Sequence, residues 1–456
     1  MIYVADRVLV RFAGEGTGSG PLSWGQQTIW RQFEARGAPV WLSGLQATRP
    51  DWAVEDAAAE LAFIMSRNQS MRTRLAVSSD RPVWQTVCDS GEIHLQVIDA
   101  ADQDDAWQVA KDLKKRWTED ELAYDYANDW PVRMALIRQH GKAAYKLLAT
   151  SHIVTDAYGA FALFNDVRAR DPVTGGPSGP IASMEPLEQA QWQAGPAGRR
   201  CSQMSERYWE RLLRVIPAER FGQPARQPVG QVRSRYGRLS FQSRAAHLAV
   251  KAIAARTSMS TSAVLLTATA VGMTRATGVH PLVPRLQVSN RFRPRLAATV
   301  SPIAQSAPCV IDIAGASFDE AVRRAHRSSL VAYKHAYFEP ARIRELVGAI
   351  SDQRGTPIDL SLMYNDIRIN TQRETASEPP LPREVQAALP LTTITWQDEY
   401  DPQMQCGIEF DNCPGTINAL MVIDTHYLGR TQAEASLREL EAVLVAAAFD
   451  PDVPTR

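Results

Sequence analysis

The sequence predicts an α/β protein of the α+β kind, built from two halves. Patterns typical of strands and of helices alternate along both halves of the chain. Its 456 residues are enough for two or three domains of ordinary size. Residues 171–180 are rich in glycine and proline and have no periodicity. We therefore expect an N-terminal lobe at 1–172, a linker at 173–180 and a C-terminal lobe at 181–456.

Composition excludes several classes of protein. Hydrophobic residues make up 45% of the chain and charged residues 22%, as in soluble globular proteins. Fifty basic and fifty acidic residues cancel, so no overall field attracts nucleic acid or a membrane. The five scattered cysteines form no Cys-x-x-Cys cluster, which argues against a disulfide framework and a structural zinc site. Without a signal-peptide core or a long apolar span, the expected location is the cytoplasm.

Short strands and longer helices are expected in the N-terminal lobe. Residues 8–12 have a strand pattern, and 14–20 form a glycine-containing connection. Ser23 and Gln26 have the spacing of a capping box, which predicts a helix that ends near Gly37. Further helices are expected at 51–67 and 104–117. After the second of these three helices, Arg72 is expected to pair with a buried carboxylate in a structural role.

A predicted β-hairpin leads to the stretch around which the chain is organised. Residues 134–139 and 144–150 flank the turn residues 140–142, a pattern typical of a hairpin. Asp156 is a favourable N-cap for the helical pattern that follows it. A strand therefore delivers His152 to a loop just before a helix. Near neutral pH, histidine can accept or position a proton.

The C-terminal lobe repeats this mixture of elements. Its predicted helices cover residues 202–216, 245–255, 261–276, 318–333 and 431–448. Its predicted strands cover residues 235–243, 282–288, 360–365, 406–410 and 420–424.

Ser151-His152-Ile153-Val154-Thr155-Asp156-Ala157 resembles the His-His-x-x-x-Asp-Gly motif of the condensation-domain superfamily of nonribosomal peptide synthesis. That superfamily shares its fold with chloramphenicol acetyltransferase. The second histidine and the aspartate match, whereas Ser151 replaces the first histidine and Ala157 replaces the glycine. Residues 21–30 and 67–75 resemble further motifs of the family. The resemblance extends over nearly the whole chain and includes the pair Asn290-Arg291.

The resemblance implies two chloramphenicol acetyltransferase-like lobes arranged as a V-shaped pseudo-dimer. A floor segment would lie at 300–308 and a latch at 371–390. His152 would face a tunnel between the lobes and handle or position a proton. Asp156 would pair with Arg291 and hold the loop. The other implied site residues are Ser151 and Ala157 as structural support, with Ser151 hydrogen-bonded, and Tyr158, Gly159, Gln305 and Ser306 along the tunnel.

The function implied by the resemblance is that of a free-standing condensation enzyme of natural-product biosynthesis. Such an enzyme joins a carrier-bound acyl or aminoacyl group to an amine or hydroxyl. The acyl or peptidyl carrier protein would act in trans and bring its own phosphopantetheine arm, with no metal or other cofactor. The protein would be a monomer with no nucleic-acid or membrane partner.

Two alternatives stay open. One is a related acyltransferase that uses a coenzyme A thioester. The other is a catalytically silent scaffold that recruits a tailoring enzyme. It is suggested by Ser151, by Ala157 and by the floor segment, in which Gln305 stands where the family usually has asparagine. A covalent mechanism through Ser151 is disfavoured, because neighbouring residues on a strand point to opposite faces.

Overall fold

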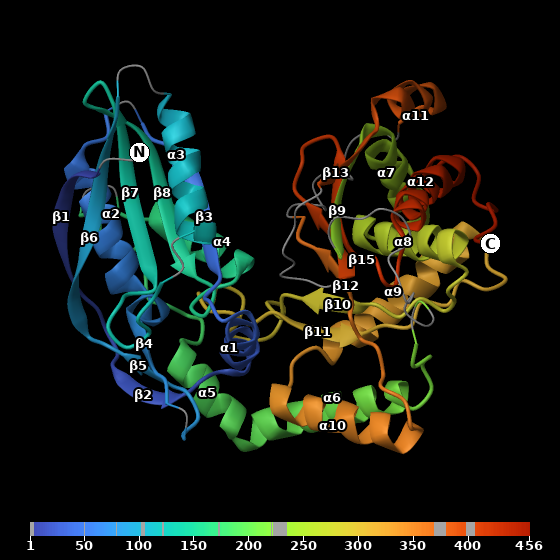
Figure 1. The fold of residues 1–456 in the computed structure, drawn as a ribbon, viewed down its shortest axis with the longest axis horizontal. Coiled ribbons are helices and arrows are strands. Elements are labelled where there is room, and N and C mark those ends of the chain that lie inside the picture. The colour runs from blue at the N-terminus through green and yellow to red at the C-terminus, as the bar shows by residue number, and fades with distance from the viewer. Residues whose placement is uncertain are drawn as a thin grey trace. The chain divides into compact units, whose positions relative to one another are not determined.

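The computed structural model divides the chain into two compact units (Figure 1). The first unit comprises Met1–Ser202 and Ser289–Gln305, and the second comprises Gln203–Val288 and Ser306–Arg456. Each unit combines a β-sheet with helices, which confirms the predicted fold class. The described residues are 4–49, 51–78, 80–101, 105–120, 123–171, 174–219, 221, 235–368, 380–397 and 406–456.

The division between the units differs from the predicted boundary at 173–180. The described part of that segment, 174–180, lies within the first unit, as does the helix α5 (Pro186–Ala194) that follows it. A hydrogen bond from the backbone N–H of Trp24 to Oε1 of Gln193 (2.9 Å) ties this helix into the first unit. No local sequence pattern marks the return of residues 289–305 to the first unit, although the expected pairing of Asp156 with Arg291 connects the two.

A five-stranded sheet forms the centre of the first unit. Its strand order is β1–β6–β7–β8–β3, and only the β6–β7 pair is parallel. One buried apolar cluster lies on each face of the sheet, as expected for strands with helices or loops on both sides. The strands are β1 (Val4–Ala13), β3 (Trp41–Ala47), β6 (Ser90–Ala100), β7 (Val132–Gln139) and β8 (Lys142–Ser151).

The predicted hairpin is confirmed, and its turn is tighter than the sequence indicated. Gln139 of β7 pairs with Lys142 of β8, so only His140 and Gly141 form the turn. Both have positive φ angles, 51° and 74°. Such a two-residue turn matches the twist of the flanking strands. The hairpin places β8 beside β7, with one register shift between Ile137 and Arg138, and β8 ends directly before His152.

The helices of the first unit begin and end close to the predicted positions. Ser23 and Gln26 form the expected capping box of α1 (Trp24–Arg36), and Gly37 ends the helix with a φ of 71°. The others are α2 (Val54–Arg67), followed by a 3₁₀ turn at Gln69–Arg72, α3 (Ala106–Lys115), followed by a π-helical turn at Arg116–Asp120, and α4 (Ala157–Arg168).

Part of the predicted connection at 14–20 is a strand. β2 (Gly18–Pro21) joins β5 (Trp84–Val87) and β4 (Thr73–Ala76) in a small antiparallel sheet. This strand was missed because its sequence, Gly-Ser-Gly-Pro, has low strand propensity.

Arg72 has a structural role: its hydrogen bonds among the described residues go to backbone carbonyls, and the buried carboxylate of Glu185 acts on it through its charge. Its side chain is fully buried. The guanidinium donates hydrogen bonds to the carbonyl oxygens of Glu15 (2.6 Å), Gly16 (3.1 Å) and Cys88. These bonds hold the end of α2 against the β1–β2 connection and the end of β5.

The first helix packs against the returning segment at a glycine. A Cβ atom added at Gly25 would lie 1.8 Å from the carbonyl oxygen of Pro302. We expect Gly25→Ala to destabilise the protein by about 1–3 kcal/mol, because backbone must move to admit the methyl group. Urea denaturation measures the effect. Gly348→Ala is the matched control, since that helical glycine has open space around its Cβ position, and we expect no loss of stability there.

The second unit is built on a seven-stranded mixed sheet. Its strand order is β11–β10–β12–β14–β15–β9–β13. The pairs β10–β12 and β12–β14 are parallel, whereas β14–β15, β15–β9 and β9–β13 are antiparallel. The strands are β9 (Tyr236–Ser243), β10 (Arg285–Val288), β11 (Gln305–Pro308), β12 (Leu362–Asp366), β13 (Thr393–Gln397), β14 (Cys406–Asp411) and β15 (Ile417–Asp424).

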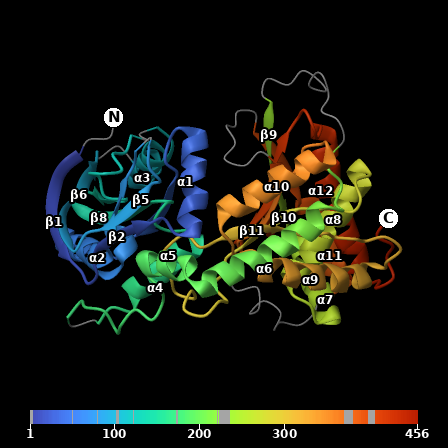
Figure 2. The same ribbon diagram turned by 90° about the horizontal axis from the view of Figure 1, so that it is seen from below.

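The helices α7, α8 and α12 gather on one face of this sheet and cover the largest apolar cluster (Figure 1). The helices α6 and α10 lie side by side (Figure 2). Arg354 at the end of α10 donates a hydrogen bond to the carbonyl oxygen of Leu213 at the end of α6 (2.6 Å). The helices are α6 (Pro196–Leu213), which begins in the first unit and enters the second at Gln203, α7 (Arg244–Thr257), α8 (Thr261–Thr277), α9 (Phe318–Lys334), α10 (Pro340–Arg354), α11 (Pro382–Ala388) and α12 (Arg430–Ala447).

The predicted latch at 371–390 falls partly outside the described residues, which resume at 380. Its described part contains α11, which packs against α7. The chain continues into β13, which pairs with β9. These described elements therefore pack within the second unit.

Candidate functional site

The loop that carries His152 is anchored by its backbone and by two apolar side chains. The backbone N–H of His152 donates to the carbonyl oxygen of Val40 (2.8 Å), which extends the β3–β8 pairing by one step. Ile153 and Val154 are buried in the core of the first unit. His152 itself is half-buried.

The ring of His152 has a defined tautomer. Its Nδ1 lies 2.7 Å from the carbonyl oxygen of Thr155. A carbonyl oxygen can only accept a hydrogen bond, so Nδ1 carries the hydrogen and donates it. In the neutral ring, Nε2 then has the free lone pair. The loop therefore presents Nε2 as the atom able to accept a proton or a hydrogen bond.

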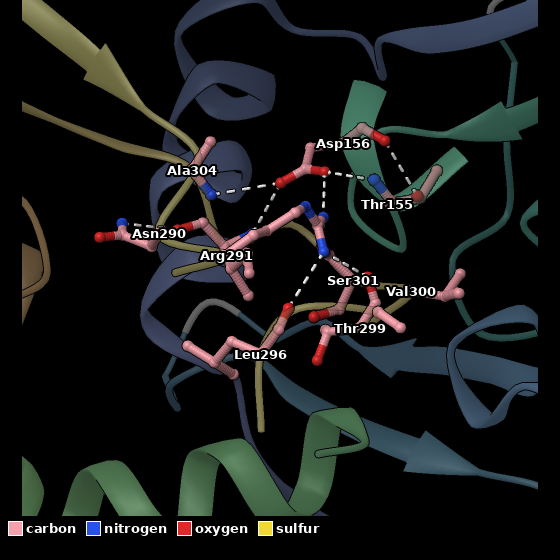
Figure 3. Close-up of polar contacts among 12 residues, drawn as sticks. Thr155, Asp156, Asn290, Arg291, Leu296, Thr299, Val300, Ser301 and Ala304 are labelled. Carbon is pink, nitrogen blue, oxygen red and sulfur yellow. Dashed lines mark hydrogen bonds and ion pairs between the residues drawn. The ribbon is translucent and has the colours of Figure 1, made fainter. Parts of the chain in front are cut away.

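Asp156 caps the next helix and binds the returning segment, as Figure 3 shows. Its Oδ1 accepts from the backbone N–H of Gly159 (2.7 Å), the cap predicted for α4. The same oxygen forms an ion pair with Arg291, in which the two side chains are only 10% and 6% exposed. Oδ2 accepts from the backbone N–H groups of Ile303 (3.0 Å) and Ala304 (3.2 Å). One carboxylate thus joins two parts of the first unit that are distant in sequence.

Arg291 holds the same segment through its carbonyl groups. Its guanidinium donates to the carbonyl oxygen of Thr299 (2.6 Å) and, with longer contacts, to those of Leu296 and Ser301 (Figure 3). Asn290 precedes it with a φ of 58° and donates from Nδ2 to the carbonyl oxygen of Ile303 (3.0 Å). The predicted pairing of Asp156 with Arg291 is therefore present, and it fixes the loop and the segment together.

The partners that sequence reasoning missed are all backbone groups. The carbonyls of Val40 and Thr155 hold His152, and the N–H groups of Ile303 and Ala304 bind Asp156. Backbone groups are present at every residue, so no residue type marks these positions. Only the folded chain could identify them.

Two expected supporting residues act differently from the prediction. Ser151 is fully buried, and its Oγ has no hydrogen-bond partner among the described residues, so the expected side-chain hydrogen bond is wrong. Its backbone contributes instead: the N–H donates to the carbonyl oxygen of Pro131 (2.9 Å), and the carbonyl oxygen accepts from the N–H of Val154 (3.0 Å). Ala157 is exposed as the first residue of α4, so its methyl group does not pack against the loop.

The four residues predicted along a tunnel have different surroundings. Gly159 is buried, and a Cβ atom there would meet Oγ1 of Thr155 at 2.5 Å and a guanidinium nitrogen of Arg291 at 3.2 Å. It therefore belongs to the supporting network. Tyr158 is half-buried and contacts Phe161 edge to face (6.4 Å between ring centroids). In β11, Gln305 is buried and Ser306 half-buried.

Glu185 also belongs to the first unit, and the pKa of its carboxyl lies above the ordinary value. Burial raises the pKa of its carboxyl to about 7, against the opposing effects of a hydrogen bond from the backbone N–H of Gln69 and of Arg72. A raised folded-state pKa contributes stability that is fully present below the unfolded pKa of 4.5 and is lost as pH rises through about 7.

We therefore expect Glu185→Gln to remove this pH dependence, which amounts to about 1–3 kcal/mol between mildly acidic and mildly alkaline pH. Urea midpoints of wild type and variant at both pH values measure it. Parallel pH dependences in the two proteins would contradict the assignment.

Neither a metal cluster nor a membrane-spanning helix was found in the described ranges. There, no three His, Cys, Asp or Glu side chains gather in an arrangement that could hold a metal ion. No described helix combines the length and hydrophobicity needed to cross a bilayer. None of the five cysteines, all of which lie in the described residues, forms a disulfide. A narrow apolar cavity of about 10 Å³ lies in the second unit beside Met273, Tyr364 and Leu440, and it contains none of the predicted site residues.

Comparisons with known proteins agree with the motif around His152. The chain matches the Condensation domain family over residues 53–413. It is 27% identical over 331 residues to the probable non-canonical nonribosomal peptide synthetase CymA of Salinispora arenicola, which covers 69% of this chain. The chain spans only 4% of the length of that relative.

Solved structures share the fold. One concerns condensation domain-mediated chain release from the enacyloxin polyketide synthase, with a TM-score of 0.69, 18% identity, and coverage of 96% of this chain and 83% of that one. Another is the complex of the X-domain and OxyB from teicoplanin biosynthesis, with a TM-score of 0.68, 17% identity, and coverage of 97% and 96%. The family match extends over most of the chain, and we conclude that this protein belongs to the condensation-domain family of nonribosomal peptide and related natural-product biosynthesis.

Proposed function

We propose that this protein forms an amide or ester bond between a carrier-bound acyl or aminoacyl thioester and an amine or hydroxyl acceptor. His152 is the residue that accepts or positions the acceptor's proton. The observation that carries the proposal is the hydrogen bond from Nδ1 to the carbonyl oxygen of Thr155 (2.7 Å), because it leaves Nε2 as the acceptor. Membership of the condensation-domain family supports the class of reaction.

The two substrates and His152 account for every bond and proton in the proposed step. The acceptor nitrogen or oxygen attacks the thioester carbonyl carbon, and the new C–N or C–O bond forms as the C–S bond breaks. The acceptor's proton passes to Nε2 of His152 and then to the departing thiolate. The buried Asp156–Arg291 pair takes no part in this proton transfer, because both side chains are occupied in holding the loop.

Ser151 favours a second candidate function, that of a catalytically silent scaffold for a partner enzyme. Its fully buried hydroxyl replaces the first histidine of the family motif and makes no hydrogen bond among the described residues. The similarity to an X-domain that was solved in complex with OxyB is compatible with this alternative. His152 and its supporting network favour catalysis, since a scaffold has no need of an oriented imidazole.

Intact-mass measurement on a separate carrier protein tests the proposal. The carrier is loaded with a panel of acyl and aminoacyl groups and incubated with the full chain and with amines or alcohols. Acceptor-dependent unloading with formation of the coupled product is the expected result. Parallel reactions with acyl-coenzyme A distinguish the related acyltransferase. Unloading no faster than without protein, across the whole panel, would support the scaffold and overturn the proposal.

A further inference from the structure

The sheet of the second unit has one apolar face and one polar face. On β14, Cys406, Ile408 and Phe410 point into the main apolar cluster. Because side chains alternate along a strand, Glu409 and Asp411 lie on the opposite face. The helices α7, α8 and α12 gather on the apolar face (Figure 1). Glu409 therefore lies near the middle of a sheet face that these helices do not cover.

Asn365 on the neighbouring strand holds Glu409 in one orientation. The two residues are directly paired in the β12–β14 register. Nδ2 of Asn365 donates a hydrogen bond to Oε2 of Glu409 at 2.7 Å. Among the described residues, no hydrogen bond or ion pair reaches Oε1 of Glu409. One carboxylate oxygen is thus positioned by the fold, while the other has no polar partner among the residues that the structure describes.

The surroundings of Glu409 destabilise the charged form of its carboxyl group. Burial raises the pKa of its carboxyl, and Asp411 adds to the rise, whereas the hydrogen bond from Asn365 and the charge of Arg238 oppose it. A desolvated carboxylate without an ion-pair partner destabilises a protein, and such groups are frequent at functional sites. Leu420 pairs with Glu409 across β14 and β15, and Met363 lies on the same face of β12. Leu420 and Met363 therefore supply apolar surface beside Glu409, on a face that also carries Asp411 and Arg238.

We propose that Glu409, held by Asn365, anchors the primary ammonium group of a small ligand with an apolar body on this face of the sheet. Oε1 can accept one hydrogen bond from an ammonium, whose other two N–H groups would be left to water. A guanidinium fits less well, because its two parallel hydrogen bonds require both oxygens and Oε2 is already occupied. The apolar body lies along Leu420 and Met363. This site goes beyond the proposed transfer reaction and does not depend on it.

Asp411 provides a matched comparison on the same face. It lies two residues further along β14, and its Oδ1 accepts a hydrogen bond from Nδ2 of Asn418 (2.6 Å). Asp411→Asn and Glu409→Gln each remove one negative charge from this face. Only Glu409→Gln removes the proposed anchor, and its amide oxygen can still accept the hydrogen bond from Asn365. The two variants therefore separate a specific site from a general effect of surface charge.

The test is a saturation-transfer NMR titration of the full chain with 2-phenylethylamine and with its neutral isostere 2-phenylethanol. We expect saturable binding of the amine, weakened at least about tenfold in Glu409→Gln and changed less than about twofold in Asp411→Asn. The alcohol should bind as weakly as the amine binds Glu409→Gln. Binding of the amine to wild type should also weaken from neutral to mildly acidic pH, because protonation removes the carboxylate.

Three results would overturn the proposal. They are equal binding of the amine by wild type and Glu409→Gln, equal weakening in Asp411→Asn, and the absence of saturable amine binding to wild type. Each of them can be obtained without an acyl transfer assay. A failure here is therefore distinguishable from a failure of the proposed function.

Discussion

Replacing His152 with alanine should lower the rate of acyl transfer by roughly a hundredfold to ten-thousandfold, the usual contribution of a positioned acid–base group. The expected loss is in kcat, because the ring handles a proton during bond formation. The fold should persist, since Ile153 and Val154 keep the loop anchored in the core. Carrier unloading followed by intact mass measures the rate, and circular dichroism checks the fold.

His152→Asn separates proton transfer from positioning of the loop. The asparagine amide can replace Nδ1 as donor to the carbonyl oxygen of Thr155 but has no atom at the position of Nε2. We expect its activity to be as low as that of His152→Ala. His94→Ala is the control, because His94 is exposed on β6 and should keep full activity. Wild-type rates in His152→Asn would contradict the role assigned to Nε2.

Replacing Asp156 with asparagine should destabilise the protein by about 3–5 kcal/mol, because it leaves the buried Arg291 without its counter-charge. The new amide would also place a donor against either Arg291 or the N–H groups of Ile303 and Ala304. Urea denaturation followed by tryptophan fluorescence measures the loss. Limited proteolysis should show earlier cleavage within residues 289–305, since Asp156 binds that segment.

A double-mutant cycle with Arg291→Met isolates the pair from the helix cap that Asp156 also provides. We expect a coupling free energy of about 1–3 kcal/mol. Arg291→Met should therefore lower the free energy of unfolding by less in the Asp156→Asn background than in wild type. Glu210→Gln is the matched control, because its ion pair with Arg214 is 43% and 51% exposed and should change stability by less than about 0.5 kcal/mol. Strict additivity at Asp156 and Arg291 would refute a direct coupling.

Local sequence patterns predicted the elements that carry the site. The capping box at Ser23 and Gln26, the hairpin before His152 and the cap at Asp156 all occur where the sequence placed them. Each depends on residues within a few positions of one another, which is why a single sequence is sufficient to find them. The motif from Ser151 to Ala157 likewise led to the family that the comparisons then showed.

Contacts between distant residues were less accessible to sequence reasoning. The pairing of Asp156 with Arg291 was expected only from the resemblance, since 135 residues separate them. No local pattern marks the return of residues 289–305 to the first unit, and the predicted boundary at 173–180 consequently differs from the observed division. Such contacts depend on how whole elements pack, and no periodicity or cap encodes that packing.

The sequence by itself determined the fold class, the elements around His152 and the family motif, because these follow from short-range patterns of hydrophobicity, turns and caps. Only the tertiary structure decided which atoms hold the histidine. The tautomer of His152 follows from one carbonyl group, and the loop is fixed by a buried carboxylate that binds a guanidinium and two backbone N–H groups. Hydrogen bonds to backbone groups carry no residue signature, so their identity exists only once the chain has folded.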